Sequence, residues 1–322
     1  MAKKNNDSAF RRLLRTDEIS VFIPLLAIIL ITFIFRRDFL SVTNFAAIFT
    51  QIPFIAIVAL GVSFPLMTGN IDISTGRVAG FAGIIMAAMC YEHNWPILPA
   101  ILVGLACGIG IGIVNGILVV HVGVPAFVGT MGTLYMVGGA RYLFIHGYQL
   151  NITDPLIDFF DKRIGGMLPY FWIMIALYVI VFILIKYTLW GRRIRAVGDN
   201  AEVASLAGIN VKRMQMTAYI LSGFFSAISG ILFALDLGYG LPETGDGWEF
   251  RAIAGCVVGG VSLSGGKGSP LGILIGVALI QIAESAIIFL GVPSTMQIAV
   301  RGALMAGAVL FDIYRQKRKV PA

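Results

Sequence analysis

Long runs of apolar residues, separated by short polar connectors, make up most of the chain. A helix needs about 20 residues to cross a hydrocarbon core of about 30 Å, so runs of this length predict transmembrane helices. The expected spans are residues 21–35, 44–68, 76–91, 97–120, 126–146, 168–188, 214–235, 250–263, 270–290 and 294–311. The pattern predicts an all-α polytopic membrane protein with about ten transmembrane helices.

Composition agrees with this pattern. Of the 322 residues, 58% are hydrophobic and only 13% are charged, against about 25% charged in an ordinary soluble domain. So little charge could not cover a soluble surface. No small-residue cleavage site follows the first apolar run, which predicts an uncleaved helix and not a signal peptide. The short runs at 76–91 and 250–263 predict tilted or broken helices.

Lysine and arginine positions predict the orientation. With the N-terminus inside, 17 of the 24 lie on the cytoplasmic side, among them Arg77, whereas Arg141 and Arg251 fall outside. The predicted organisation is a cytoplasmic tail (1–20), one transmembrane domain (21–311) and a second cytoplasmic tail (312–322), with a cytoplasmic loop at 189–215. The net charge of +7 is therefore an orientation signal, and a nucleic-acid surface is not expected.

Two blocks of spans, 44–146 and 214–311, are offset by five spans. An odd offset would make helices 2–5 and 7–10 an inverted repeat. Ten spans would put both chain termini on the same side, and the lysine and arginine positions predict that this side is cytoplasmic. Small residues recur every fourth position within these blocks, which predicts helix faces that pack closely, either as fixed seams or as seams that slide during transport. These residues are Gly104, Gly108, Gly112 and Gly116, then Ser222, Ser226 and Gly230, and finally Gly272 and Gly276.

The cytoplasmic loop carries a helix signal. Asp199 and Glu202 have the spacing of a capping box and Gly208 can end a helix, which predicts a short helix at about 200–207. Such a short helix is not stable alone, so its apolar face should lie on the lipid headgroups or dock into a groove of a cytosolic partner. That face consists of Val203, Leu206 and Ala207.

Four segments carry a family resemblance. Residues Glu202–Gly208 resemble the Glu-Ala-Ala-x-x-x-Gly loop of ABC importer permeases, with valine at the second position. Three others resemble motifs of ribose/arabinose-type sugar permeases: Thr68–Gly76, Val124–Thr133 and Gly247–Gly268. The chain is thus similar, over about residues 20–315, to the permease subunit of a ribose/arabinose-type ABC sugar importer, related to the branched-chain amino-acid permease superfamily.

The resemblance implies a set of partners. These are a cytosolic ABC ATPase subunit, an extracytoplasmic sugar-binding protein and a second permease subunit, identical or paralogous, within the lipid bilayer of a bacterial inner membrane. It also implies that the loop residues contact the ATPase: Asp199, Glu202, Val203, Leu206, Ala207 and Gly208.

A nucleotide site is not expected in this chain. The turn Ser264–Gly268 superficially resembles a phosphate loop, but Val261 stands where that loop needs glycine, and Gly268 where it needs serine or threonine. The chain should therefore hold no cofactor, while ATP and Mg²⁺ bind the partner ATPase. The histidines and cysteines are scattered without ligand spacing, so neither a metal site nor an enzymatic activity is expected.

Polar residues in or near the spans are candidates for the transport pathway or a gate, because charges in a membrane are costly. Glu284 and Arg301 could pair across adjacent helices, as a structural bond or a gate element. Asp72 could cap a helix starting near Ser74 or contact substrate. The full candidate set is Asp72, Ser74, Asn115, Phe127, Glu284 and Arg301.

Together these features predict a permease that moves a monosaccharide or similar solute by alternating access, driven by ATP hydrolysis in a separate subunit. The competing hypothesis is an ion-gradient-driven secondary transporter of a small solute, which inverted blocks and broken helices would suit equally. The sequence names neither the sugar nor the partner permease.

Overall fold

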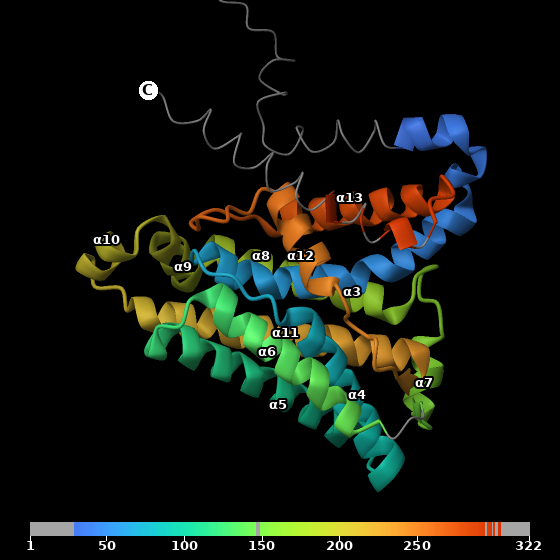
Figure 1. Cartoon of the computed structure of the whole chain (residues 1–322), viewed down its shortest axis with the longest axis horizontal. Helices are drawn as coiled ribbons and strands as arrows, with labels where there is room; N and C mark the ends of the chain where they lie inside the picture. The colour runs from blue at the N-terminus through green and yellow to red at the C-terminus, as the bar shows by residue number, and fades with distance from the viewer. Residues whose placement is uncertain (1–28, 146–148, 294, 298, 300–301, 304–322) are drawn as a thin grey trace, which may run out of the picture.

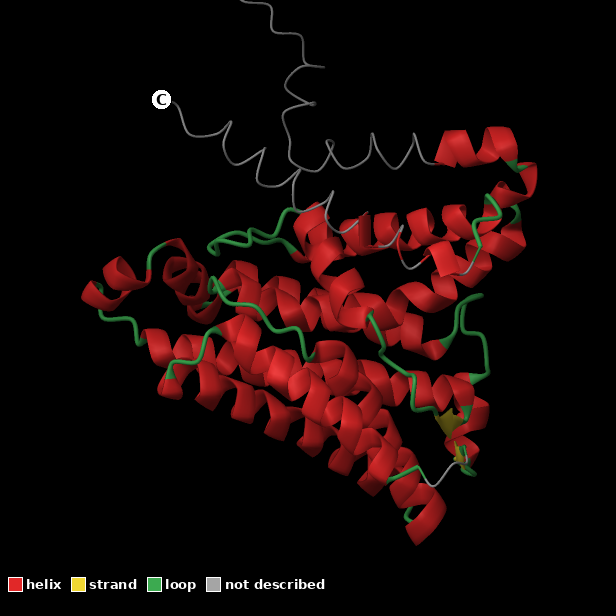
Figure 2. Cartoon of the chain, viewed as in Figure 1, coloured by secondary structure: helices red, strands yellow, loops and turns green. Residues whose placement is uncertain are grey.

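The computed structural model describes residues 29–145, 149–293, 295–297, 299 and 302–303 (Figure 1). Of these residues, 77% lie in helices, and the strands in this part of the chain form a single two-stranded pair (Figure 2). The predicted all-α class is confirmed.

Five helices are long and apolar enough to cross a membrane, and they run side by side along the longest axis of the molecule (Figure 1). This confirms the polytopic architecture. They are α3 (Val42–Met67), α5 (Ile97–Gly116) with its continuation η2 (Ile117–Val122), α8 (Pro169–Tyr187), α11 (Val211–Leu237) and α13 (Pro270–Phe289).

Three further expected spans contain shorter or less apolar helices: α4 (Thr75–His93), α6 (Ala126–Ala140) and α12 (Trp248–Val258). The 11 residues of α12 extend about 16 Å, roughly half of a hydrocarbon core. Most of the first and tenth expected spans lies outside the described residues, so the count of ten stays a prediction.

The two ends of the bundle differ. At one end, the α10 end, lie α9 (Leu189–Asp199) and α10 (Ala201–Leu206). At the other, the sheet end, β1 (Leu150–Asn151) pairs antiparallel with β2 (Tyr239–Gly240) beside α7 (Pro155–Phe160) (Figure 2). The segment between α6 and α8 thus contains a short strand and a short helix.

The glycine seam of α5 packs against α11, as predicted. A methyl group added to Gly112 would lie 2.5 Å from the carbonyl oxygen of Tyr219, well inside van der Waals contact. Further along α11, Gly230 lies against the backbone of Ala79 in α4. The missing side chains thus let three helices approach closely enough for dispersion contacts to hold them without water.

Two helices begin inside the bundle. α3 ends at the α10 end, where the Met67 carbonyl accepts a hydrogen bond from Gly266 N at 3.0 Å, and residues 68–74 then return into the bundle before α4 begins. Similarly, α11 ends at the sheet end and residues 241–247 return before α12 begins. The first turns of α4 and α12 meet, because Gly76 abuts Gly245. The two units run in opposite directions, the relation predicted for the two blocks.

The meeting point corrects the charge assignment. Arg77 was expected in a cytoplasmic connector and Arg141 outside, but both pair with Asp246, at 2.5 and 2.9 Å. The lysine and arginine count assigned each residue to one side of the membrane from its position along the chain alone. This fails where re-entrant segments bring residues into the bundle. The direction of the lysine and arginine bias is unchanged, because Arg77 alone leaves the cytoplasmic count, while Arg141 and Arg251 leave the outside count.

Candidate functional site

The short helix of the 189–215 loop is α10, and its cap differs by one residue from the expectation. Asn200 is the N-cap, and its Oδ1 accepts hydrogen bonds from the backbone nitrogens of Glu202 and Val203 at 3.0 and 3.1 Å. Asp199 instead ends α9, which corrects its predicted capping role. Gly208 follows α10 with φ +79°, a conformation that glycine adopts without strain.

The apolar face of α10 is not covered by the described part of the chain. Val203 is 59% exposed, Leu206 is 89% exposed and Ala207 is also exposed. The side of α10 that packs inward carries Ala204, which lies in a small cluster with Val197 and Met214. The helix is thus anchored on one side and presents an exposed leucine on the other.

The end of α9 connects α10 with the bundle. Gly198 abuts the Met67 carbonyl at the end of α3, so closely that no side chain would fit. The Asp199 carboxylate lies against Gly266 in the turn that precedes α13. A displacement of α9 and α10 would therefore press directly on the end of α3 and on residues 68–74, since packed backbones do not compress.

Asp72, in the first re-entrant segment, is the centre of a buried hydrogen-bond network. Its Oδ1 accepts from Ser74 N at 3.0 Å, Ser74 Oγ at 2.7 Å and Asn115 Nδ2 at 3.4 Å, and its Oδ2 accepts from Ser222 Oγ at 2.7 Å. Thr133 Oγ donates to Asn115 Oδ1 at 2.6 Å. The network joins residues 68–74 to α5, α6 and α11.

The predicted candidates Asp72, Ser74 and Asn115 are thus brought together. Asp72 is only 1% exposed, and the groups that donate hydrogen bonds to its carboxylate, from Ser74, Asn115 and Ser222, are all neutral. Neutral donors can stabilise a buried carboxylate when several converge on it. Ser222, a member that sequence analysis assigned only to helix packing, supplies one of them.

A second, charged cluster lies where α4 and α12 meet. Arg141 is fully buried at the end of α6, in η3 (Arg141–Leu143), and donates to the Thr244 carbonyl at 2.7 Å as well as to Asp246. Arg77, in the first turn of α4, shares the same carboxylate. Glu249, in the first turn of α12, is 3% exposed and lies against Gly76. Carboxylates beside two helix N-termini are favoured by the helix dipoles.

Within the described part of the chain, three buried side-chain atoms lack a hydrogen-bond partner: Thr75 Oγ1, Arg77 Nε and Glu249 Oε2. All three belong to the first turns of α4 and α12. A buried polar atom without a partner costs about 1–3 kcal/mol. Their concentration at one place marks the charged cluster as a site whose hydrogen bonding is incomplete in this structure.

The remaining candidates are placed elsewhere. Glu284 on α13 pairs with Arg251 of α12 at 3.4 Å, whereas Arg301, its predicted partner, lies outside the described residues. Arg251 was expected in an outside connector and instead belongs to α12. Phe127 is 50% exposed near the start of α6.

Residues 44–309 match the family described as branched-chain amino acid transport system / permease component. The chain belongs to this permease family. Among curated relatives, it is 30% identical to the L-arabinose ABC transporter permease protein AraH of Azospirillum brasilense, over 95% of this chain and 89% of the relative.

Two other relatives have similar coverage. The permease is 33% identical to the galactose/methyl galactoside import permease protein MglC of Haemophilus influenzae, over 91% of this chain and 93% of the relative. It is 31% identical to the autoinducer 2 import system permease protein LsrC of Klebsiella pneumoniae, over 94% of this chain and 88% of the relative. No solved structure matches it.

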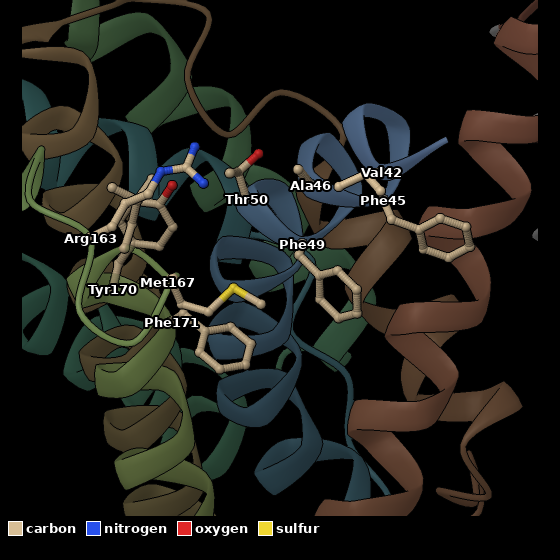
Figure 3. Close-up of a pocket in the computed structure, with 11 residues that line it drawn as sticks. Val42, Phe45, Ala46, Phe49, Thr50, Arg163, Met167, Tyr170 and Phe171 are labelled. Carbon is tan, nitrogen blue, oxygen red and sulfur yellow. The ribbon is translucent and has the colours of Figure 1, made fainter. Parts of the chain in front are cut away.

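Two surface hollows lie in the described part of the permease. One, of about 270 Å³, lies between the outer turns of α3 and α8 and is lined mainly by aromatic and aliphatic side chains, with Arg163 beside Tyr170 at its rim (Figure 3). The other, of about 330 Å³, is more polar and lies at the sheet end between Trp95 and Asp154. Neither is lined by residues of the charged cluster.

Proposed function

We propose that the permease is the transmembrane subunit of a binding-protein-dependent ABC importer in a bacterial inner membrane. It moves a monosaccharide or a similar small sugar-like solute by alternating access. ATP and Mg²⁺ bind a separate cytosolic ATPase subunit, and hydrolysis there drives the change between outward- and inward-open states. The named functions of the relatives, which include arabinose, galactose and autoinducer 2 import, support a sugar-like solute.

The observation that carries this proposal is the exposed apolar face of α10. Val203 and Leu206 project from a helix that the chain caps at both ends but does not cover. A short helix with one apolar face fits a hydrophobic groove on a partner protein. The ATPase is that partner, and this places the α10 end in the cytoplasm.

The packing of α9 provides a route for the movement. Pressure on α10 passes through Gly198 to the end of α3, and from there into residues 68–74, which Asp72 ties to α5 and α11. The ATPase would thus move the segment that precedes α4, and with it the junction between α4 and α12. These contacts form a physically continuous chain, which is the minimum that such coupling requires.

The sheet end then faces the binding protein. It presents the β1–β2 pair and α7, and delivery of the solute occurs over this surface. A second permease, identical or paralogous, completes the pathway beside this one. The alternative of an ion-driven secondary transporter is less well supported, because the named relatives are permeases of ABC or import systems.

The test is substitution in α10 within the reconstituted complex of permease, ATPase and binding protein. Leu206→Asp should abolish ATP-driven uptake and ATPase binding while leaving membrane insertion intact, because Leu206 is 89% exposed and supports no core. Ser205→Asp adds the same charge to an exposed position outside the apolar face and serves as the matched control.

Two further variants address the shape of the helix. Glu202→Lys reverses the charge in the first turn, and Gly208→Pro cannot adopt the positive φ of that position. Both should uncouple uptake from ATP hydrolysis. Normal uptake by Leu206→Asp or Gly208→Pro, with the ATPase still bound, would contradict the assignment of α10.

A further inference from the structure

The Arg77–Asp246 pair lies deep within the bundle. Asp72 bonds Ser222 of α11 and Ala79 abuts Gly230 of α11, so Arg77 lies at a level between these two positions. Gly230 is seven residues, about 10 Å, from the sheet end of α11, and Ser222 is eleven residues, about 16 Å, from the α10 end. The pair is therefore at membrane depth.

At this depth the pair is not covered. The side chains of Arg77 and Asp246 are 25% and 38% exposed on the surface of the chain. Beside Arg77 runs α6, whose Gly138 lies close to the arginine side chain and whose Gly139 has open space around it. Lipid tails cannot satisfy an exposed ion pair, so charges here are tolerated only where they face a water-filled cavity or another protein.

The cluster contains charged donors and carboxyl acceptors. Arg77 and Arg141 are cations, Asp246 pairs with both of them, and the carboxyl group of Glu249 lies against Gly76 at the same junction. Together these groups offer strong hydrogen-bond donors and acceptors. That combination suits a neutral molecule with several hydroxyl groups, each of which both donates and accepts.

The unpartnered atoms belong to the same place. Thr75 Oγ1, Arg77 Nε and Glu249 Oε2 have no hydrogen-bond partner among the residues that the structure describes, and they lie in the first turns of the two helices that begin here. A small separation of α4 from α12 would expose them together with the ion pair. They would then be free to bond to hydroxyl groups of a passing solute.

We propose that this cluster is the solute-contact point of the translocation pathway, with Thr75, Arg77, Asp246 and Glu249 hydrogen-bonding the hydroxyl groups of a neutral sugar. This rests on the proposed function, and it names the residues that the solute meets within the membrane. The Arg77–Asp246 pair faces the aqueous pathway. During passage, hydroxyl groups of the solute replace the hydrogen bonds within this pair. Few polar groups take part, so the solute is bound weakly and released.

The first test is Thr75→Val in the reconstituted complex, with uptake of L-arabinose and galactose as the readout. The substitution preserves side-chain shape and removes a hydroxyl that no protein group uses, so the thermal unfolding midpoint should not fall. Uptake should fall about five-fold through loss of one hydrogen bond to the solute. Thr217→Val is the matched control, because its hydroxyl bonds the Met214 carbonyl of its own helix.

The second test measures access of water to the cluster. In a permease whose three native cysteines, Cys90, Cys107 and Cys256, are replaced, Thr75→Cys should react with a small water-soluble thiol reagent in at least one nucleotide state. Transported sugar should slow this reaction. Absence of reaction both without nucleotide and with trapped ATP would overturn the proposal, as would wild-type uptake by Thr75→Val.

These outcomes are separable from the proposed function. If the wild-type complex accumulates neither sugar with ATP, the proposed function fails for those solutes, while the thiol reaction still decides whether water reaches Thr75. If the wild type accumulates sugar and Thr75→Cys is inert, only the solute-contact point is wrong.

Discussion

The two re-entrant segments, residues 68–74 and 241–247, occupy corresponding places in oppositely directed units, yet they hold their carboxylates in different ways. Asp72 is 1% exposed and accepts hydrogen bonds from two serines and an asparagine. Asp246 has a side chain 38% exposed and pairs with two arginines. A buried carboxylate can be held by neutral donors alone, whereas Asp246 must also neutralise the buried Arg141.

The comparison separates two roles. The Asp72 network is buried, and both oxygens of its carboxylate accept hydrogen bonds. It therefore fixes the 68–74 segment to its neighbours as one rigid piece. The charged cluster, which contains Asp246, is partly exposed and includes the atoms without a hydrogen-bond partner. Its residues can therefore exchange partners. In an alternating-access cycle, a rigid segment would transmit movement and an incomplete cluster would respond to it.

The largest expected effect comes from Asp246→Ala. This removes the shared partner of Arg77 and of the fully buried Arg141, and leaving a buried charge unpaired costs about 3–5 kcal/mol. The unfolding midpoint of the purified permease in detergent should fall strongly, or the protein should fail to accumulate. Glu243→Ala, in the same segment but exposed, is the control. Equal midpoints for the two variants would remove the structural basis of the comparison.

A smaller loss is expected from Asp72→Asn. The amide keeps the shape but has one acceptor oxygen, and its NH₂ group would face donors, so stability should fall by about 1.5–3 kcal/mol. Thermal unfolding in detergent measures this. Asp154→Asn is the matched control, since Asp154 caps α7 at the surface by accepting from Leu156 N and asparagine caps equally well. A loss no greater than that of the control would show that the Asp72 network is not a structural anchor.

The smallest effect is expected from Ser222→Ala. It deletes only the donor to Asp72 Oδ2, worth about 1 kcal/mol, and sharpens the comparison by testing one bond of the network. Ser226→Ala, one turn later, loses only a bond to a carbonyl of its own helix and should be nearly neutral. The same unfolding assay applies, and identical midpoints would indicate that Asp72 is held mainly by Ser74 and Asn115.

Much of the fold followed from local patterns. Apolar runs located the long helices, four-residue glycine spacing located the α5 seam, and turn residues located α10. The cap of α10 was displaced by one residue because aspartate and asparagine cap almost equally well. In the structure α9 continues to Asp199, with Gly198 packed against the Met67 carbonyl, and this leaves Asn200 as the N-cap of α10.

The candidate site was predicted less completely. Asp72, Ser74 and Asn115 were selected as polar residues in or near spans, and they do meet. Arg77, Arg141 and Asp246 were missed. The two arginines lie towards the ends of expected spans and were counted with the connectors, and Asp246 lies in a connector. The only local signal was the pair of short runs after Gly76 and Arg251, which predicted broken helices without showing that their starts meet. The fold brings Arg251 to Glu284, which was not predicted, and the predicted Glu284–Arg301 pair involves a residue outside the described ranges and stays a prediction.

The sequence by itself determined which segments enter the membrane, where helices pack closely and which loop carries a capped helix, because these properties depend on residues within a few turns of one another. Only the tertiary structure decided which charges meet. Arg141 and Asp246 are separated by 105 positions, and their pairing exists because two segments re-enter the bundle from opposite ends. Charge pairing depends on distance in space and on exclusion of water, and neither is a property of local sequence.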